Sequence, residues 1–479
     1  MPLLEETTMP QEHPPTVPVV IIGNGPSGIC LSYLLSGHKP YLDTATVHPN
    51  PILYRKLQES KHLSITEQVK PLEEECSCMI TVTQPFAPCP SVEEGQAATH
   101  PTSGAGEGNA WRRLAMEGSM LTISLGIWME LPGVNYRDLT NGKHRDVTSD
   151  RATPEEISSY YRDYVKLKGL QKNFVDNTYV TSIQKLCREH EEEGGALWEV
   201  RGYQQVQNDT HVPFSLFAEN VVLATGASDS PVRLGAEGED LPFVFHSISD
   251  LGLAVSQRKL DVNSDPVLIV GAGLSAADAV LCACNSHVRV LHVFRKSVGD
   301  SDLIFKQLPK TLYPEYHKVY NMMCSQSYTN TPQLAAGSVA GNAGVDLFPD
   351  YTSFPEHCLV SFQSDRRCLL QGNNSLKAFK ISMALVLIGT NPNLFFLKGQ
   401  GQYLGQDPTK PISCTQNPID IHPYTFECTR EPGLFAMGPL VGDNFVRFLK
   451  GGALGIASCL LKRLKQKGTL IGDGGNDFI

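Results

Sequence analysis

Three glycines at fixed spacing follow a short apolar run near the start of the chain. The run, Val19–Ile22, is β-branched and of strand length, as expected for a strand buried on both faces. In the G-x-G-x-x-G pattern after it, Gly23 allows a tight turn, Gly25 lets the backbone approach a pyrophosphate, and Gly28 lets a helix pack close to the strand. The pattern therefore predicts a dinucleotide cradle with phosphate at the helix N-terminus. The residues expected to contact the nucleotide are Gly23, Gly25, Pro26, Ser27 and Gly28.

A second pattern of this kind lies in the middle of the chain. The apolar run Val267–Val270 leads into a G-x-G-x-x-A turn and a helix. Either turn alone could be an ordinary glycine turn of an α/β protein. Two such turns in one chain, each between a strand and a helix, favour two bound nucleotides. The residues expected to contact the second nucleotide are Gly271, Gly273, Leu274, Ser275 and Ala276.

Charged residues after the neighbouring strands indicate which nucleotide each cradle binds. Arg295 and Lys296 end the strand that follows the second cradle, where an NAD site places an acid. A guanidinium pairs with the 2'-phosphate of NADPH, so this pair favours NADPH over a merely solvated strand end. Asp43 follows Gly23 by 20 residues and is the candidate for the ribose of the first nucleotide, the alternative being a loop residue without a ligand.

Two later turns are expected to complete the first cradle. The apolar run at 220–223 ends in Ala-Thr-Gly, a sequence that marks where two-nucleotide flavoproteins leave the FAD domain. Near the end of the chain a strand closes on Gly-Asp, and the pattern at 448–462 predicts a final helix that would complete the flavin pocket. The additional residues expected at the FAD site are Thr225, Gly226, Gly442 and Asp443.

Other elements are predicted from capping and alternation. Thr153-Pro154-Glu155-Glu156 is a capping box that opens a helix to about Lys168. Segment 69–107 has few apolar residues in any period and predicts loop or disorder, and segment 325–350, rich in Gly, Ala, Asn and Pro, predicts a surface loop. Alternating residues predict a meander and two later strands at 179–186, 197–203, 213–218, 358–362 and 379–388.

The composition excludes several classes of protein. With 41% hydrophobic and 19% charged residues the chain is typical of a globular protein, and no apolar run reaches the roughly 20 residues of a membrane span. A net charge of -10 argues against nucleic acid as the main partner. The N-terminus lacks the pattern of a signal peptide, and the 13 cysteines show no metal-ligand or C-x-x-C spacing. We therefore expect reduced thiols, no metal, and a location in the cytoplasm or the nucleus.

Five long stretches resemble the class B flavin monooxygenases and, more closely, the oxidative stress-induced growth inhibitor family. They are 19–36, 116–129, 265–282, 308–319 and 440–454. The resemblance implies FAD in the first cradle, NADPH in the second, and a flavin contact at Trp111, which falls where the family's Gly-Gly-x-Trp motif ends. It also implies a role in oxidative stress and in the control of cell growth, differentiation and cell division, including meiosis or germ-cell maturation, and with it a location on cell-division structures.

The chain departs from the family at two motifs. Asn109 replaces the second glycine of the Trp111 motif, and Arg112 stands where a histidine is expected. The stretch 241–247 resembles the monooxygenase fingerprint but lacks its glycine. These departures weaken the expected retention of flavin.

The combined pattern predicts an α/β fold with two Rossmann-like dinucleotide-binding domains and a small β-meander. The FAD domain is expected to be discontinuous, with the NADPH domain inserted into it. The predicted segments are a disordered N-terminus at 1–17, the FAD domain at 18–262 and 382–467 with an atypical loop at 69–107, the NADPH domain at 263–381, and a disordered tail at 468–479.

The favoured function is an NADPH-using, FAD-dependent monooxygenase that acts on a small molecule or on a nucleophilic side chain of a protein partner. A thiol–disulfide reductase is disfavoured because the FAD domain has no C-x-x-C or C-x4-C pair. An amine oxidase would have no use for a second nucleotide domain. A catalytically weak regulatory protein that binds nucleotides and keeps the flavoprotein fold remains the alternative.

Overall fold

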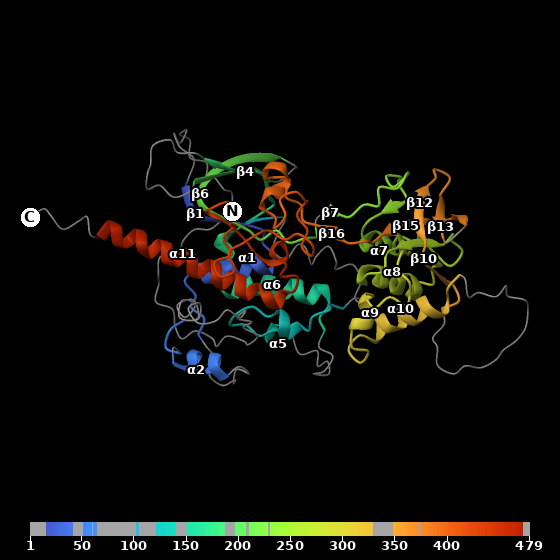
Figure 1. Ribbon diagram of the computed structural model, residues 1–479, viewed down its shortest axis with the longest axis horizontal. Helices are drawn as coiled ribbons and strands as arrows, with labels where there is room; N and C mark the ends of the chain where they lie inside the picture. The colour runs from blue at the N-terminus through green and yellow to red at the C-terminus, as the bar shows by residue number, and fades with distance from the viewer. Residues whose placement is uncertain are drawn as a thin grey trace, which may run out of the picture.

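A computed structural model describes residues 16–41, 51–59, 61–64, 102–104, 121–139, 151–186, 197–206, 210–228, 230–328, 348–372 and 375–472. They form two lobes, which the chain connects through the short paired strands β7 (Ser230–Pro231) and β16 (Thr390–Asn391) (Figure 1). Strands from both ends of the chain share one sheet, so the first lobe is discontinuous and the second is inserted into it. This arrangement confirms the predicted fold class.

The first lobe is built around the parallel strands β1 (Thr16–Ile22) and β6 (His211–Leu223). The first part of β6 pairs antiparallel with β5, and its last part pairs with β1 and β17. The prediction of separate strands at 213–218 and 220–223 was wrong, because burial along β6 changes from partial to continuous within one strand. The other strands of this sheet are β2 (Thr102–Gly104), β3 (Phe174–Asp176), β4 (Thr178–Leu186), β5 (Leu197–Gln205) and β17 (Leu434–Ala436).

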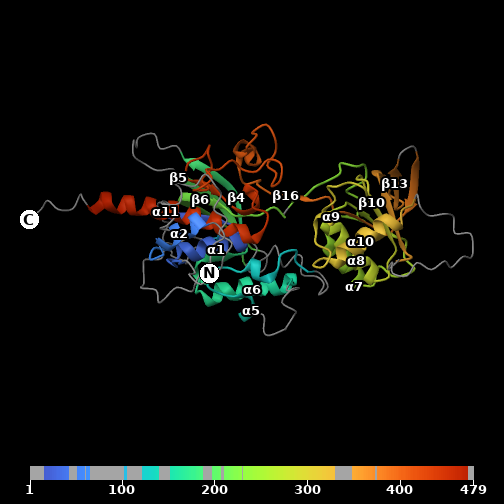
Figure 2. The same ribbon diagram turned by 60° about the horizontal axis from the view of Figure 1, so that its bottom comes forward.

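Three helices pack together against one face of this sheet (Figure 2). They are α1 (Pro26–Leu35), α6 (Pro154–Leu167) and α11 (Leu449–Gly472). The predicted capping box opens α6: the Glu156 amide donates to Thr153 Oγ1 at 3.2 Å, and the Thr153 amide donates to Glu156 Oε2 at 2.9 Å. Shorter helices are α2 (Pro51–Glu59), η1 (Gly126–Met129), α5 (Tyr136–Leu139), η2 (Gln171–Asn173), η4 (Lys398–Leu404), η5 (Gly438–Val441) and η6 (Val446–Phe448).

The second lobe contains a parallel sheet with the strand order β11-β10-β9-β15-β8. The strands are β8 (Val244–Phe245), β9 (Val267–Val270), β10 (Val290–Phe294), β11 (Tyr351–Pro355) and β15 (Met383–Val386). One face packs on α7 (Ile248–Ser256), α8 (Leu274–Asn285), α9 (Ile304–Gln307) and α10 (Pro314–Ser325). The other face packs on an antiparallel unit of β12 (Cys358–Phe362), β13 (Arg367–Gln371) and β14 (Leu376–Lys380).

The extent of the second lobe differs from the predicted domain boundaries. The predicted strand at 379–388 is two strands, β14 and β15, which belong to different sheets. β8 pairs with β15, and α7 contributes to the core of the second lobe. The second lobe thus begins before residue 262 and continues past residue 382. A two-residue strand such as β8 is too short to produce a recognisable alternation pattern.

Three segments expected to lack regular structure contribute to it. Thr16 and Val17 belong to β1, and β2 lies within the predicted loop 69–107, where it pairs with β1. α11 continues to Gly472, beyond the predicted helix end at 462 and the predicted tail boundary at 467. The remainder of 69–107 lies outside the described residues.

Candidate nucleotide-binding sites

The first glycine turn connects β1 to α1, and each of its glycines has a different steric role. Gly23 has a φ of 114°, and a Cβ there would lie 2.3 Å from the carbonyl oxygen of Ala224. A Cβ on Gly28 would lie 2.0 Å from the carbonyl oxygen of Gly23. Gly25, in contrast, has no atom within 4 Å of its Cβ position. The turn therefore leaves open space at the glycine predicted to face a pyrophosphate.

The groups around this turn fit an anionic, polar ligand. Gly25 is the N-cap of α1, no side chain caps this helix end, and its first turn contains no acid. Amides at such a helix end attract a phosphate. Two buried polar atoms beside the turn, Asn24 Nδ2 and Thr225 Oγ1, have no hydrogen-bond partner among the described residues. Because buried polar groups are normally satisfied, these two atoms fit a bound nucleotide such as FAD.

Two other turns lie at the same edge of the first sheet. Thr225 and Gly226 follow β6 directly after Ala224, whose amide donates to Ile22 O at 2.8 Å. The turn after β17 approaches α1, since a Cβ on Gly438 would lie 2.8 Å from Ser27 Oγ. The structure thus brings the three predicted turns together at the carboxyl ends of parallel strands, where α/β proteins bind ligands.

The last of these turns carries Gly442 and Asp443. Gly442 has a φ of 93°, and the Asp443 amide donates to Gly438 O at 3.1 Å. Burial raises the pKa of Asp443 to about 6. The carboxylate is therefore ionised at neutral pH and could accept hydrogen bonds from the hydroxyl groups of a ligand. The other predicted FAD contacts, Asp43 and Trp111, lie outside the described residues.

The second glycine turn connects β9 to α8 and repeats this geometry. Gly271 has a φ of 136°, and a Cβ there would lie 2.2 Å from the carbonyl oxygen of Leu387. Gly273 has no atom within 4 Å of its Cβ position, and Ala276 is fully buried under the turn. Gly273 is the N-cap of α8, again without a capping side chain or an acid in the first turn. The backbone at Gly273 (φ -93°, ψ -178°) is extended like that at Gly25 (φ -76°, ψ -175°).

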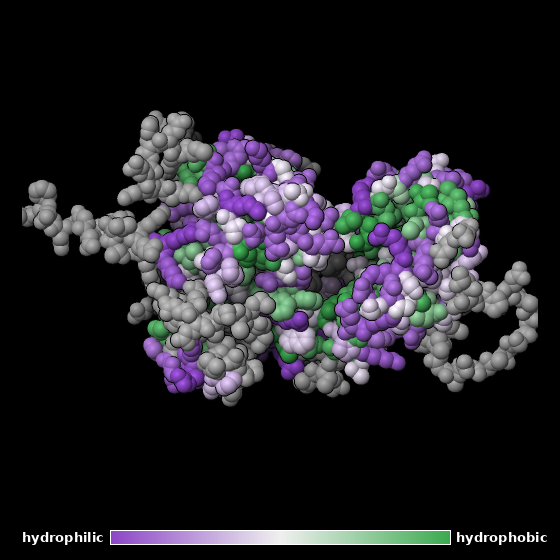
Figure 3. Space-filling model, in the orientation of Figure 1, coloured by the Kyte–Doolittle hydropathy of each residue, from purple (hydrophilic) through white to green (hydrophobic). Residues whose placement is uncertain are grey.

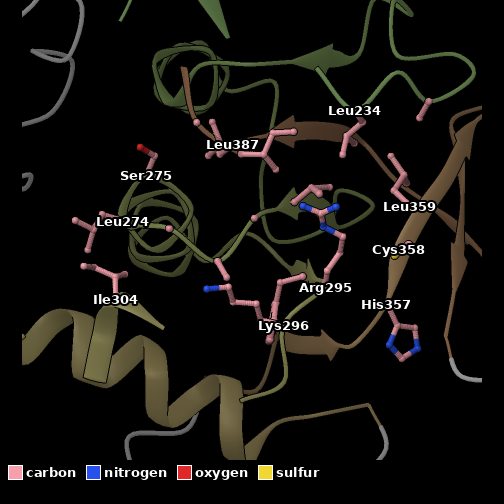
Figure 4. Close-up of a pocket in the computed structure, with 18 of the residues that line it drawn as sticks. Leu234, Leu274, Ser275, Arg295, Lys296, Ile304, His357, Cys358, Leu359 and Leu387 are labelled. Carbon is pink, nitrogen blue, oxygen red and sulfur yellow. The ribbon is translucent and has the colours of Figure 1, made fainter. Parts of the chain in front are cut away.

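A cavity of about 880 Å³ opens beside the second turn (Figure 4). Its wall includes the turn residues with Leu274 and Ser275, the end of β10, the loop 234–236 and part of β12. Arg295 extends into the cavity, is exposed, and has no hydrogen-bond or ion-pair partner among the described residues. Lys296 Nζ donates to Asp302 O at 3.2 Å. Arg295 is therefore the better placed of the two to receive a phosphate group.

His292 supports the second turn from below. This fully buried side chain on β10 places Nε2 2.7 Å from Gly271 O and Nδ1 2.8 Å from Tyr351 Oη. A carbonyl oxygen only accepts, so Nε2 carries the proton and Nδ1 accepts from the tyrosine hydroxyl. Burial lowers the pKa of His292 to about 4, which keeps the ring neutral in this role. Sequence reasoning missed His292, although a histidine inside an apolar strand was a usable signal.

A buried acid holds the loop on another side of the cavity. Glu239 accepts the amides of Leu234 and Gly235 at 3.0 and 2.8 Å, and it lies 2.9 Å from His246 Nε2. Burial alone would raise the pKa of Glu239, but these hydrogen bonds lower it below its ordinary value. The ionised carboxylate thus fixes a loop that lines the cavity. No local sequence pattern pairs Glu239 with His246.

The described His, Cys, Asp and Glu side chains bear on metal ligation and disulfide bonding. They contain no group of three His, Cys, Asp or Glu side chains able to hold a metal ion. The nine described cysteines are free thiols. Among the described residues no helix is long and apolar enough to cross a membrane.

Comparisons with known proteins agree with this geometry. Human oxidative stress-induced growth inhibitor 2 is 52% identical over 519 aligned positions that cover both chains completely. The bacillithiol disulfide reductase Bdr from Bacillus cereus has a TM-score of 0.58 at 14% identity, covering 94% of this chain and 99% of the reductase. An ornithine N-hydroxylase from Kutzneria, in a structure with reduced FAD, NADP+ and L-ornithine, has a TM-score of 0.54 at 13% identity, covering 94% of this chain and all of the hydroxylase. The sequence matches no protein-family profile.

The two lobes and their glycine turns define the two-domain, Rossmann-type fold of flavin-dependent reductases and monooxygenases. Within this class the chain belongs to the oxidative stress-induced growth inhibitor family, because its human relative is alike over the full length of both chains. The 519 aligned positions exceed the 479 residues of this chain by 40, so the alignment leaves 40 positions without a residue in this chain.

Proposed function

We propose that this protein binds FAD at the first glycine turn and NADPH in the cavity beside the second, and that it acts as an NADPH-dependent flavin monooxygenase. The observation that carries the proposal is the repeated geometry of Gly25 and Gly273. Each is an open, extended N-cap glycine on a helix without a capping side chain. Two anion sites of this kind, on separate lobes, suit two dinucleotides.

Different residues would bind each of the two nucleotides. Asn24, Thr225 and Asp443 would hold the first nucleotide through hydrogen bonds, and Arg295 would select NADPH through its 2'-phosphate. Bound flavin supplies hydride acceptance from NADPH and the activation of O2. The protein binds and orients both nucleotides and keeps bulk water away from the reacting atoms.

The reaction class predicts a defined oxygen balance. NADPH, a proton, O2 and a soft nucleophile give NADP+, water and the oxygenated nucleophile. The relatives' names connect the family with oxidative stress and growth inhibition. We propose that this activity supports a role of this chain in growth, differentiation and cell division, including meiosis.

The experiment uses the full-length protein purified without added flavin. We expect flavin absorbance near about 450 nm and NADPH consumption in air. With 18O2 and methyl p-tolyl sulfide as a thioether probe, we expect a sulfoxide that carries one labelled oxygen. NADPH consumption without labelled sulfoxide would show that the protein acts as an oxidase, and not as a monooxygenase, in the presence of this probe. Protein that binds neither FAD nor NADPH would overturn the proposal.

The second candidate is a catalytically weak regulatory protein that binds nucleotides. The departures at Asn109 and Arg112 favour it, since they alter a motif expected beside the flavin. This candidate predicts binding of NADPH with no turnover. The flavin content and the oxygen label therefore separate the two.

A further inference from the structure

The side chain of Arg151 is buried where the two lobes meet. It belongs to the first lobe, precedes α6, and is only 3% exposed. Its Nε donates to Thr122 O at 2.7 Å and its Nη2 donates to Leu121 O at 3.2 Å. Leu125 also pairs with Arg151 through an antiparallel bridge. Arg151 and 121–125 therefore form one connected unit.

The same guanidinium reaches the second lobe. Arg151 Nη1 donates to Glu315 Oε1 at 2.5 Å and to Leu312 O at 3.3 Å, both at the start of α10. Its Cζ lies 4.7 Å from the ring centroid of Tyr313 and 5.7 Å from that of Tyr316. The Arg151 guanidinium thus attaches the start of α10 to the first lobe, both through hydrogen bonds and through its position over two aromatic rings.

The unit around Arg151 also packs into the second lobe. Tyr313 Oη donates to Ile123 O at 2.7 Å, and the Ile123 side chain packs against the core of the second lobe. Within the part of the chain that the structure describes, the backbone passes between the lobes at the narrow pair β7 and β16. In Figure 3 the surface is hollowed between the lobes, with apolar residues on both sides. Contacts at Arg151 thus restrict a junction that would otherwise rest on two thin connections.

The contacts of α10 extend to α8, the helix that follows the second glycine turn. Tyr316 on α10 interacts with Asp278 on α8, the helix whose N-terminus carries Gly273, and this interaction affects the pKa of both groups. α8 and α10 share one core. A shift of α10 relative to the first lobe would therefore carry the second cradle with it.

We propose that Arg151 is a positioning residue: through Glu315 and Tyr313 it sets how the lobes face each other, and so how NADPH approaches the first cradle. Glu315 is 30% exposed, whereas Arg151 is buried and also donates to two carbonyl groups of the first lobe, so a substitution of Glu315 removes the contact between the lobes with the smaller effect on the first lobe. The effect on turnover rests on the proposed function. The effect on the arrangement of the lobes does not.

The test compares Glu315→Lys and Glu315→Asp in the full-length protein. Reversal of the charge places two cations together, whereas aspartate keeps the attraction. The matched control is Glu431→Lys, because Glu431 Oε2 lies 3.1 Å from Lys185 Nζ in an ion pair that is confined to the first lobe. Small-angle X-ray scattering measures the maximum dimension of each variant, and stopped-flow absorbance measures flavin reduction by NADPH.

We expect Glu315→Lys to increase the maximum dimension by more than 5% and to slow flavin reduction at least tenfold, with NADPH affinity changed less than twofold. Glu315→Asp and the control should behave as wild type. Unchanged scattering with an unchanged rate in Glu315→Lys would overturn the proposal. An altered scattering curve in a protein that binds no flavin would support the positioning role and contradict the proposed function instead. A variant that does not fold is replaced by Glu315→Gln, for which the same outcomes apply.

Discussion

His292 Nε2 lies 2.7 Å from the carbonyl oxygen of Gly271, so a buried imidazole directly supports the glycine that opens the second nucleotide turn. The ring can make this bond and accept from Tyr351 only while it is neutral. Protonation would put a donor against the tyrosine hydroxyl and a charge into the core. The second cradle therefore contains a group whose titration opposes folding in acid.

His292 predicts a loss of stability below neutral pH. Its folded pKa is about 4, below the ordinary value of 6.5, so the unfolded chain binds the proton first as pH falls. Stability should therefore be lost between about pH 6.5 and pH 4, by an amount on the order of 3 kcal/mol. Thermal unfolding of His292→Gln should show a flatter pH profile than wild type. His211→Gln, at an exposed position, should not, and equal flattening in both variants would contradict this assignment.

Asp278 predicts the opposite trend. Burial raises its pKa to about 6, above the ordinary value of 3.8, although the hydrogen bond with Tyr316 lowers it in part. As pH falls, the folded state thus binds the proton before the unfolded chain does. Above pH 6 the ionised Asp278 carboxylate therefore lowers the stability of the folded state. Asp278→Asn should raise stability at pH 7.5 by roughly 1 to 3 kcal/mol and have little effect at pH 4. A gain of the same size at both pH values would show that charge is not the cause.

Arg295 predicts the choice of nucleotide. It extends into the second cavity without a partner among the described residues. Loss of a charge-assisted contact to the 2'-phosphate should weaken NADPH binding about 10- to 100-fold in Arg295→Ala and leave NADH binding unchanged. Isothermal titration with both nucleotides measures this, with Arg367→Ala as a control whose side chain is 58% exposed. Equal losses for NADPH and NADH would indicate a general structural effect.

Gly25 and Gly273 predict separable defects. A Cβ at either position meets no protein atom within 4 Å, so alanine should leave folding intact. The methyl group would instead occupy space needed by the pyrophosphate. Gly25→Ala should lose flavin and keep NADPH binding, and Gly273→Ala should do the reverse. Each variant is the control for the other. Flavin absorbance measures the flavin content, and calorimetry measures NADPH binding. Full retention of both ligands would contradict the proposed sites.

The glycine turns could be predicted from the sequence because their chemistry is local. Strand, turn and helix follow one another within a few residues, and Gly23 and Gly271 need their backbone conformation for reasons visible in the spacing. The Thr153 capping box was equally predictable, since both partners lie within one turn.

Contacts between distant residues could not be predicted in this way. Arg151 and Glu315 are 164 residues apart, and no periodicity connects them. The second sheet also takes β8 and β15 from either side of the predicted domain boundaries. The first half of β6 is partly exposed and the second half is buried, so its sequence resembles two separate strands. The hydrophobic pattern of a sequence follows the burial of each residue and does not show whether the strand is continuous.

The measurement that tests the central claim most directly is anaerobic titration of the purified flavin-bound protein with NADPH. The account predicts that absorbance near about 450 nm bleaches with one equivalent of NADPH per flavin, and that NADH is at least tenfold slower. A protein that holds flavin whose spectrum stays unchanged in excess NADPH would contradict it.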